Sequence, residues 1–202
     1  MGSPLTEHER VEIETAHKAC ITQDFLLGKY EITQAQWEAV MGKNPSHFEK
    51  CGSRCPIENI SWEDIQIFIK KLNTNSALKF RLPTEAEWEF AARAGTSTAF
   101  AFGENINTSQ VNYDGDHPYQ GKATGLDRKT PVSVGSLPAN PWGFHEMHGN
   151  VWEFVSDWHN LDYYTNSPTN DPKGPKSGSF HIRRGGSWRF GARLCRSAYR
   201  GR

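Results

Sequence analysis

The chain has 202 residues, of which 36% are hydrophobic, and its formal net charge is zero. This length supports one sizeable core without requiring a second, so we expect a single domain. No run of about 18 apolar residues occurs, which predicts that no segment spans a membrane. The first residues, MGSPLTEHER, are too polar for a signal peptide, and MGS is typical of an expression-tag remnant. We therefore set residues 1–24 apart as an N-terminal extension and expect the domain over 25–202.

The first half of the chain contains two segments with clear helix signals. In TQAQWEAVMG, Thr33 is followed three residues later by Gln, a capping-box pattern that predicts a short helix near residues 34–41. SWEDIQIFIKKLN begins at Ser61 and carries apolar residues at helical spacing, which indicates one buried stripe. These apolar residues are Ile65, Phe68, Ile69 and Leu72.

RLPTEAEWEFAARAG predicts a third helix, with Thr84 and Glu87 as its capping box and Gly95 as its C-terminal stop. From about residue 96 onward the chain is rich in Gly, Pro, Asn and Asp, with short apolar pieces that suit brief strands. So much irregular chain needs large side chains to anchor it. The obvious anchors are Trp142, Trp152, Trp158 and Trp188.

The neutral total conceals an asymmetry, because no Asp or Glu follows Asp171 while nine basic residues do. These are Lys173, Lys176, Arg183, Arg184, Arg189, Arg193, Arg196, Arg200 and Arg202. Such a basic end is open to two interpretations, a nucleic-acid stripe or arginines that fold back onto the acidic body. We favour the second, because Gly, Ser and aromatic residues interrupt the arginines. No nucleic-acid partner is therefore expected.

The four cysteines comprise a close pair, Cys51 and Cys55 in FEKCGSRCP, and two distant singles. A zinc site would need two more Cys or His at matching spacing, and none follows the pair. We therefore prefer a disulfide between Cys51 and Cys55 over free thiols. A disulfide predicts an oxidising compartment, so we expect an extracellular or cell-surface location. Cys20 is most simply a buried small hydrophobe.

Five motifs together resemble the formylglycine-generating, sulfatase-modifying factor family, from about residue 25 to the end. They are GKYEITQAQWEAVMGKNP, PIENISWEDIQIFIKKLN, RLPTEAEWEFAARAG, GFHEMHGNVWEFVSDWH and RRGGSW. The resemblance implies an α+β domain, a variant of the C-type lectin fold with few helices, short strands and high loop content. Some members are oxidases that convert a sulfatase cysteine to formylglycine with two copper(I)-binding cysteines after the RGGS motif. Others are binding scaffolds, such as the variable proteins of diversity-generating retroelements.

The segment GGSWRFGARLCRSAYRGR distinguishes these two kinds of member. By resemblance, the oxidase cysteines lie three and eight residues after the serine, which here are Phe190 and Cys195. A phenyl ring cannot replace a thiolate ligand of copper(I), so we expect no copper and no oxidase activity. The oxidase remains the alternative. A lone Cys195 nucleophile would need a base, for which His159 and His181 are the nearest candidates, and we prefer a buried, inert thiol.

We therefore expect a non-catalytic scaffold that binds a protein or other macromolecular ligand through residues 149–202, the ligand-display segment. The predicted ligand-binding residues are His159, Asn160, Arg189, Phe190, Gly191 and Leu194. We expect Trp152, Trp158 and Trp188 to hold this surface rigid from beneath. An ordinary exposed loop is the competing interpretation.

GFHEMHGNVWEFVSDW combines carboxylates with exposed carbonyls, a donor set that suits calcium. By resemblance, calcium is bound by the side chains of Glu146 and Glu153 and the carbonyls of Gly149 and Val151. A Glu at 146 is longer than the Asn or Asp usual in the family. In the competing interpretation, Glu153 and Asp157 accept hydrogen bonds from C-terminal arginines. Those arginines would be Arg183, Arg184 or Arg196.

Overall fold

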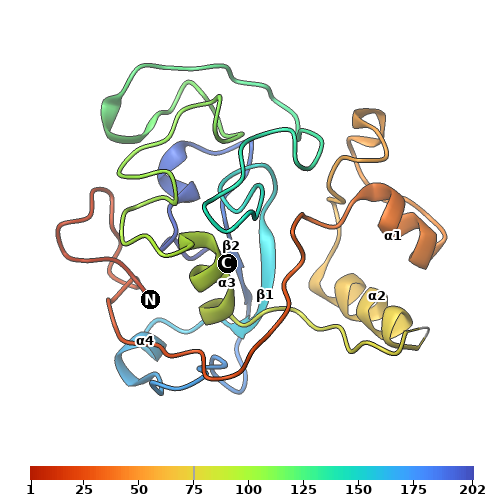
Figure 1. Ribbon diagram of the computed structural model, residues 1–202, viewed down its shortest axis with the longest axis horizontal. Helices are drawn as coiled ribbons and strands as arrows, with labels where there is room; N and C mark the ends of the chain where they lie inside the picture. Colours follow the sequence, from red (N-terminus) through yellow and green to blue (C-terminus); the bar gives the residue numbers. More distant parts are fainter. Residues whose placement is uncertain (75) are drawn as a thin grey trace.

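A computed structural model describes residues 1–74 and 76–202 (Figure 1). The predicted α+β architecture of few helices, short strands and extensive loops is confirmed. Its helices are α1 (Gln34–Met41), α2 (Trp62–Thr74), α3 (Glu85–Arg93) and the short α4 (Tyr163–Asn166). Its strands are β1 (Glu153–Trp158) and β2 (His181–Arg184), and short 3₁₀ helices cover Glu49–Cys51, Tyr119–Gly121 and Ala192–Cys195. Among the described residues, no helix has both the length and the apolar composition needed to cross a membrane.

The three predicted helices form, and α1 and α3 begin at the predicted capping boxes. The Thr33 hydroxyl accepts a hydrogen bond from the Gln36 amide, and the Thr84 hydroxyl does the same at the start of α3. In both capping boxes the Gln or Glu side chain in turn accepts a hydrogen bond from the backbone amide of the cap residue. These bonds satisfy amides that have no partner at the start of a helix. The stop of α3 differs slightly from prediction, because Ala94 already has a left-handed backbone, with φ 46°, before Gly95.

The two strands pair antiparallel beside α3, with Glu153 opposite Arg184 and Trp158 opposite His181. The residues near the C-terminus extend this sheet, because Gly201 pairs with Arg183 on the other edge of β2. The side of the sheet that faces α3 is fully buried. Its apolar cluster comprises Trp88, Ala91, Ala92, Met147, Val155 and Ile182.

Two further apolar clusters support the loops. Trp37 of α1 stacks on Phe68 of α2 with ring centroids 4.8 Å apart, so these helices share a small core to one side of the sheet (Figure 1). The other cluster lies beneath the loops of the second half and includes Cys195. Its remaining buried members are Ala99, Phe100, Ile106, Val111, Tyr113, Tyr119 and Ala192.

Three residues near the start of the chain, Gly2, Ser3 and Glu14, are buried in the domain. The amide of Gly2 donates to the Glu89 carboxylate at 3.0 Å, and the Ser3 hydroxyl donates to Glu14 at 2.8 Å. Ser3 and Glu14 are almost completely buried. The start of the chain is therefore tied to the domain by buried hydrogen bonds, and the boundary at residue 24 stays a prediction. Glu14 is also the partner of a buried arginine near the other end of the chain, Arg196.

Three C-terminal arginines point inward and pair with carboxylates, as the fold-back interpretation predicts. Arg184 and Arg196 are completely buried and Arg200 is 2% exposed. Their partners are Glu89 for Arg184, Glu7 and Glu14 for Arg196, and Glu85 for Arg200. The competing assignment to Glu153 and Asp157 is wrong, because Glu153 accepts from the Trp88 indole and Asp157 from the Glu85 amide.

Candidate functional site

The RGGS loop fixes the centre of the ligand-display segment. Gly149 donates its amide to the Gly185 carbonyl at 2.7 Å, and Trp188 donates to the Asn150 carbonyl at 2.9 Å. Gly186 has φ 77°, and a Cβ there would lie 2.7 Å from the Cys195 sulfur. Only glycine combines this backbone conformation with so close an approach. The loop after β2 is therefore held tightly against the start of the segment.

The Cys195 thiol is unsuited to chemistry in this structure. It is completely buried, and burial raises its pKa to about 12, so the thiol stays protonated at neutral pH. The position predicted for a partner thiol holds Phe190. The nearby His148 uses Nδ1 on the Cys195 carbonyl and Nε2 on the Ala101 amide, and burial lowers its pKa to about 4. This imidazole is neutral and committed to backbone groups.

The two histidines proposed as possible bases lie elsewhere. His181 begins β2 and is stacked between Trp62, 3.9 Å away, and Trp158, 3.6 Å away. The RGGS loop leaves the opposite end of this strand. His159 follows β1 and donates its amide to the Phe180 carbonyl. Both histidines thus lie at the Trp158 end of the sheet, whereas Cys195 belongs to the cluster beneath the loops of the second half.

Three aromatic rings, Trp152, Phe190 and Tyr199, form what we call the aromatic shelf. The centroids of Phe190 and Tyr199 each lie 6.0 Å from that of Trp152. Phe190 is 40% exposed, and Arg189 beside it is also exposed. The Arg183 guanidinium lies over the Trp152 ring at 5.6 Å. The shelf thus presents apolar and cationic groups together on the outer side of the sheet.

The remaining predicted display positions are less free. Gly191 and Leu194 are half-buried, and a Cβ on Gly191 would lie 2.9 Å from the Cβ of His117. Packing therefore restricts position 191 to glycine. His159 and Asn160 follow the end of β1, whereas Trp152 precedes its start. The structure thus separates this pair from the aromatic shelf.

The tryptophans expected beneath the surface are half-buried, and each supports a different place. Trp152 belongs to the shelf itself, and Trp158 stacks on the His181 ring. Trp188 meets Phe48 edge to face at 5.3 Å, which connects the segment to the loop after α1. The three tryptophans therefore contact different parts of the domain and do not form one layer beneath the display surface.

A groove of about 830 Å³, which the sequence did not predict, is lined in part by Phe48, the ring that Trp188 contacts. Its walls come from the loop after α1, from Asn59 and from a second loop near residue 130. The lining residues are Pro45, Ser46, His47, Phe48, Glu49, Lys50, Cys51, Asn59, Thr130 and Pro131. A disulfide joins Cys51 to Cys55 at this wall, whereas Cys20 is a half-buried free thiol. A volume of this size is within the range of ligand sites.

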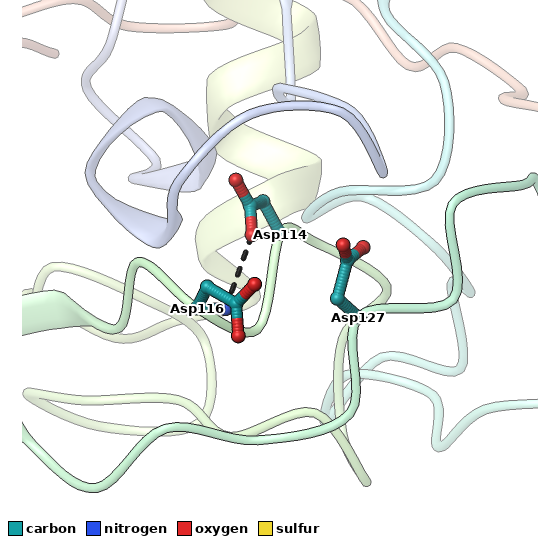
Figure 2. Close-up of side chains that lie close together, drawn as sticks. All are labelled: Asp114, Asp116 and Asp127. Atoms are coloured by element: carbon teal, nitrogen blue, oxygen red, sulfur yellow. Dashed lines mark hydrogen bonds between the residues drawn. The ribbon is translucent and has the colours of Figure 1, made fainter.

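A second unpredicted feature is an acidic rim, which we define as Asp114, Asp116 and Asp127. Figure 2 shows Asp114 and Asp116 on one loop and Asp127 on a separate stretch beside them. One carboxylate oxygen of each lies within 4.8 Å of the others. Asp114 already accepts from the Asp116 amide at 3.1 Å and contacts His117 Nδ1 at 2.7 Å. The Asp114 amide donates to the Phe190 carbonyl at 3.0 Å, so the rim borders the aromatic shelf.

The predicted calcium ligands lie among buried acidic groups. Glu146 accepts the Gly135 amide on both carboxylate oxygens, at 3.1 and 3.0 Å, and Glu153 accepts the Trp88 indole N–H at 3.1 Å. A third carboxylate, Glu31, accepts from the side chain of Asn150 and the amide of Val151. Burial and the neighbouring carboxylates raise the pKa of Glu153 to about 7 and that of Glu31 well above its usual range. Carboxylates without a compensating cation are the donor type that a divalent cation prefers.

The fold and this site define a C-type-lectin-like domain with a loop-rich C-terminal half. Residues 1–202 match the sulfatase-modifying factor enzyme 1-like domain, and the chain belongs to that family. The resemblance inferred from its motifs is therefore confirmed.

A variable protein and a formylglycine-generating enzyme are both among the known proteins similar to this chain. The structure of Treponema denticola variable protein 1 matches with a TM-score of 0.79 and 28% identity over 96% of this chain and 84% of that one. A formylglycine-generating enzyme of Streptomyces coelicolor is 36% identical over 149 residues, 71% of this chain and 44% of that enzyme. The chaperone protein LppX of Paenibacillus barcinonensis is 29% identical over 221 residues, 89% of this chain and 74% of that protein. The chain thus spans less than half of the Streptomyces enzyme.

Proposed function

We propose that this domain is a non-catalytic scaffold that binds a macromolecular ligand through the outer side of its ligand-display segment. The observation that carries the proposal is the contrast between Cys195 and Phe190. The cysteine is buried and protonated, whereas the position expected for a second thiol presents an exposed aromatic ring. Copper(I) chemistry needs soft thiolate donors, whereas recognition needs aromatic and Arg side chains on a rigid support.

The likeness to Treponema denticola variable protein 1 supports this proposal, since it extends over nearly the whole chain. The groove supports it further, because its wall contains Phe48, the ring against which Trp188 of the segment packs, so the segment reaches a hollow of ligand size. His159 and Asn160 are retained as a separate ligand contact at the other end of β1. The alternative function, a formylglycine-generating oxidase that acts on sulfatase cysteines, is favoured by the Streptomyces relative.

An oxidation assay separates the two functions. The protein is incubated with copper(I), oxygen, a thiol reductant and a peptide that contains a sulfatase cysteine motif, and mass spectrometry is used to detect the aldehyde. The Streptomyces coelicolor enzyme provides the positive control. We expect no aldehyde from this chain. An aldehyde that forms with the natural protein and disappears with Cys195→Ala would replace the scaffold by the oxidase.

Calcium belongs to the proposal as a structural ion. The side chains of Glu146 and Glu153 and the carbonyls of Gly149 and Val151 would hold it, and its charge would compensate the buried carboxylates. The Glu146 carboxylate would have to share its oxygens between the ion and the Gly135 amide. The ion would brace the loop that receives the Trp188 amide.

We also propose an extracellular or cell-surface location, which the Cys51–Cys55 disulfide supports. A thiol-alkylation experiment on intact cells that express the natural gene tests it. Mass spectrometry should find both cysteines protected from alkylation until a reductant is added. Alkylation of both without reduction would place the protein in a reducing compartment.

A further inference from the structure

The basic residues of the C-terminal segment divide into two sets. Arg184, Arg196 and Arg200 are buried and paired with carboxylates. The other six form no ion pair within the described part of the chain, and all but the half-buried Arg183 are exposed. These six are Lys173, Lys176, Arg183, Arg189, Arg193 and Arg202. Because no acidic residue follows Asp171, the segment itself supplies no carboxylate to these six side chains.

Three of these arginines border the aromatic shelf. Arg183 lies over Trp152 and donates a hydrogen bond to the carbonyl of Arg202, which places these two residues together. Arg189 directly precedes Phe190, whose ring packs near Trp152. A guanidinium can stack on an aromatic ring and still bind a carboxylate with two parallel hydrogen bonds. An apolar ligand side chain on the shelf would therefore be flanked by sites for carboxylates.

The acidic rim limits which anionic ligand fits. It adjoins Phe190 through the bond between the Asp114 amide and the Phe190 carbonyl. A nucleic acid carries a phosphate at every step, so part of its backbone would approach these carboxylates and be repelled. A polypeptide can place its acidic side chains at the arginines and neutral or basic ones at the rim.

We infer that the ligand of this surface is a polypeptide segment that combines acidic side chains with an apolar side chain seated on the aromatic shelf. The inference rests on the proposed function and names the ligand class for the same surface. Charge complementarity of this kind sets orientation and partner choice more than raw affinity.

The test uses a phage-displayed library of random peptides, selected on the full chain at low ionic strength. The same selection is run on the triple variant R183Q/R189Q/R202Q and on a matched control, K70Q/K71Q/K79Q. The control loses the same charge from exposed lysines on and after α2, which packs against α1 to one side of the sheet (Figure 1). Far-ultraviolet circular dichroism and urea unfolding verify that both variants fold.

We expect the recovered peptides to be enriched in Asp and Glu and to contain an apolar residue. A recovered peptide, synthesised and labelled, should bind the triple variant about tenfold more weakly, as expected for three partly exposed ion pairs, and the control variant unchanged. Peptides no more acidic than the library, or no recovered peptide, would contradict the inference. If an oligodeoxynucleotide binds more tightly than the recovered peptide, and the triple variant loses that binding, the inferred polypeptide ligand is wrong and nucleic acid replaces it.

A Phe190→Ala variant separates failure of the inference from failure of the proposed function. If non-acidic peptides are recovered and lose binding with Phe190→Ala, the surface binds ligands but the assigned ligand class is wrong. If binding depends neither on Phe190 nor on the three arginines, both the inference and the proposed function fail.

Discussion

Removal of the Arg196 side chain tests the division between inward and outward arginines. This guanidinium donates to both Glu14 carboxylate oxygens at 2.7 Å and to Glu7 at 2.5 Å, and the side chains of both acids are at most 4% exposed. Arg196→Ala leaves two buried carboxylates without their cation, which costs about 3–5 kcal/mol when a buried pair loses one partner. The exposed Arg189→Ala should cost no more than about 0.5 kcal/mol.

The assay is urea unfolding of the disulfide-intact protein, followed by tryptophan fluorescence. A difference of about 3 kcal/mol between the two variants is more than a hundredfold in the folding equilibrium. Arg196→Lys keeps the charge but loses the bidentate geometry, so it should fall between them and supplies a measurable value if the alanine variant does not fold. A cost below about 1 kcal/mol for Arg196→Ala, or an equal cost for Arg189→Ala, would refute the reasoning.

Three further outcomes follow from the site. Phe190→Ala should keep a cooperative urea transition and cost less than the about 3–5 kcal/mol of a fully buried ring, because Phe190 is 40% exposed; an unfolded variant would place the ring in the core. Calcium should raise the melting temperature of the natural protein and leave Glu153→Gln unchanged, so a calorimetric scan without any shift removes calcium from the proposal. Burial and the Glu85 carboxylate raise the pKa of Asp157 to about 7, and the native state then keeps a proton that the unfolded chain releases near pH 4. This contribution to stability is complete below about pH 4 and is lost as the pH rises to 7, by about 1.4 kcal/mol per pH unit at most. Asp157→Asn should therefore flatten the pH dependence of the urea midpoint. An unchanged pH dependence in this variant contradicts the raised pKa of Asp157.

Local signals in the sequence predicted the helices well. The caps at Thr33 and Thr84 depend on hydrogen bonds between residues three positions apart, so both partners can be recognised within one short motif. The burial of C-terminal arginines was also predictable, because a basic end and an acidic body must compensate each other somewhere. The partners of these arginines could not be predicted, since the hydrogen bonds from Arg196 to Glu14 join residues 182 positions apart.

The missed parts of the site come from irregular chain. Asp114 and Asp127 approach each other because two stretches of loop lie side by side, and no periodicity of the sequence predicts that pairing. Glu31 reaches Asn150 across 119 residues, although the motif GKYEIT that contains it was recognisable. The resemblance also placed positions on one display surface that the fold separates, because His159 and Phe190 belong to opposite ends of β1.

The alternation of β2 explains how one basic segment serves both the core and the surface. Successive side chains of a strand point to opposite faces of the sheet. Arg184 therefore enters the interior, where it lies 5.1 Å from the Trp88 ring and pairs with Glu89, while Arg183 turns outward over Trp152. The inward arginine ties the strand to α3, and this fixes the shelf on which the outward arginine lies. A shift of one residue in this register would bury Arg183 and expose Arg184, so the surface charge depends on the pairing of Glu153 with Arg184.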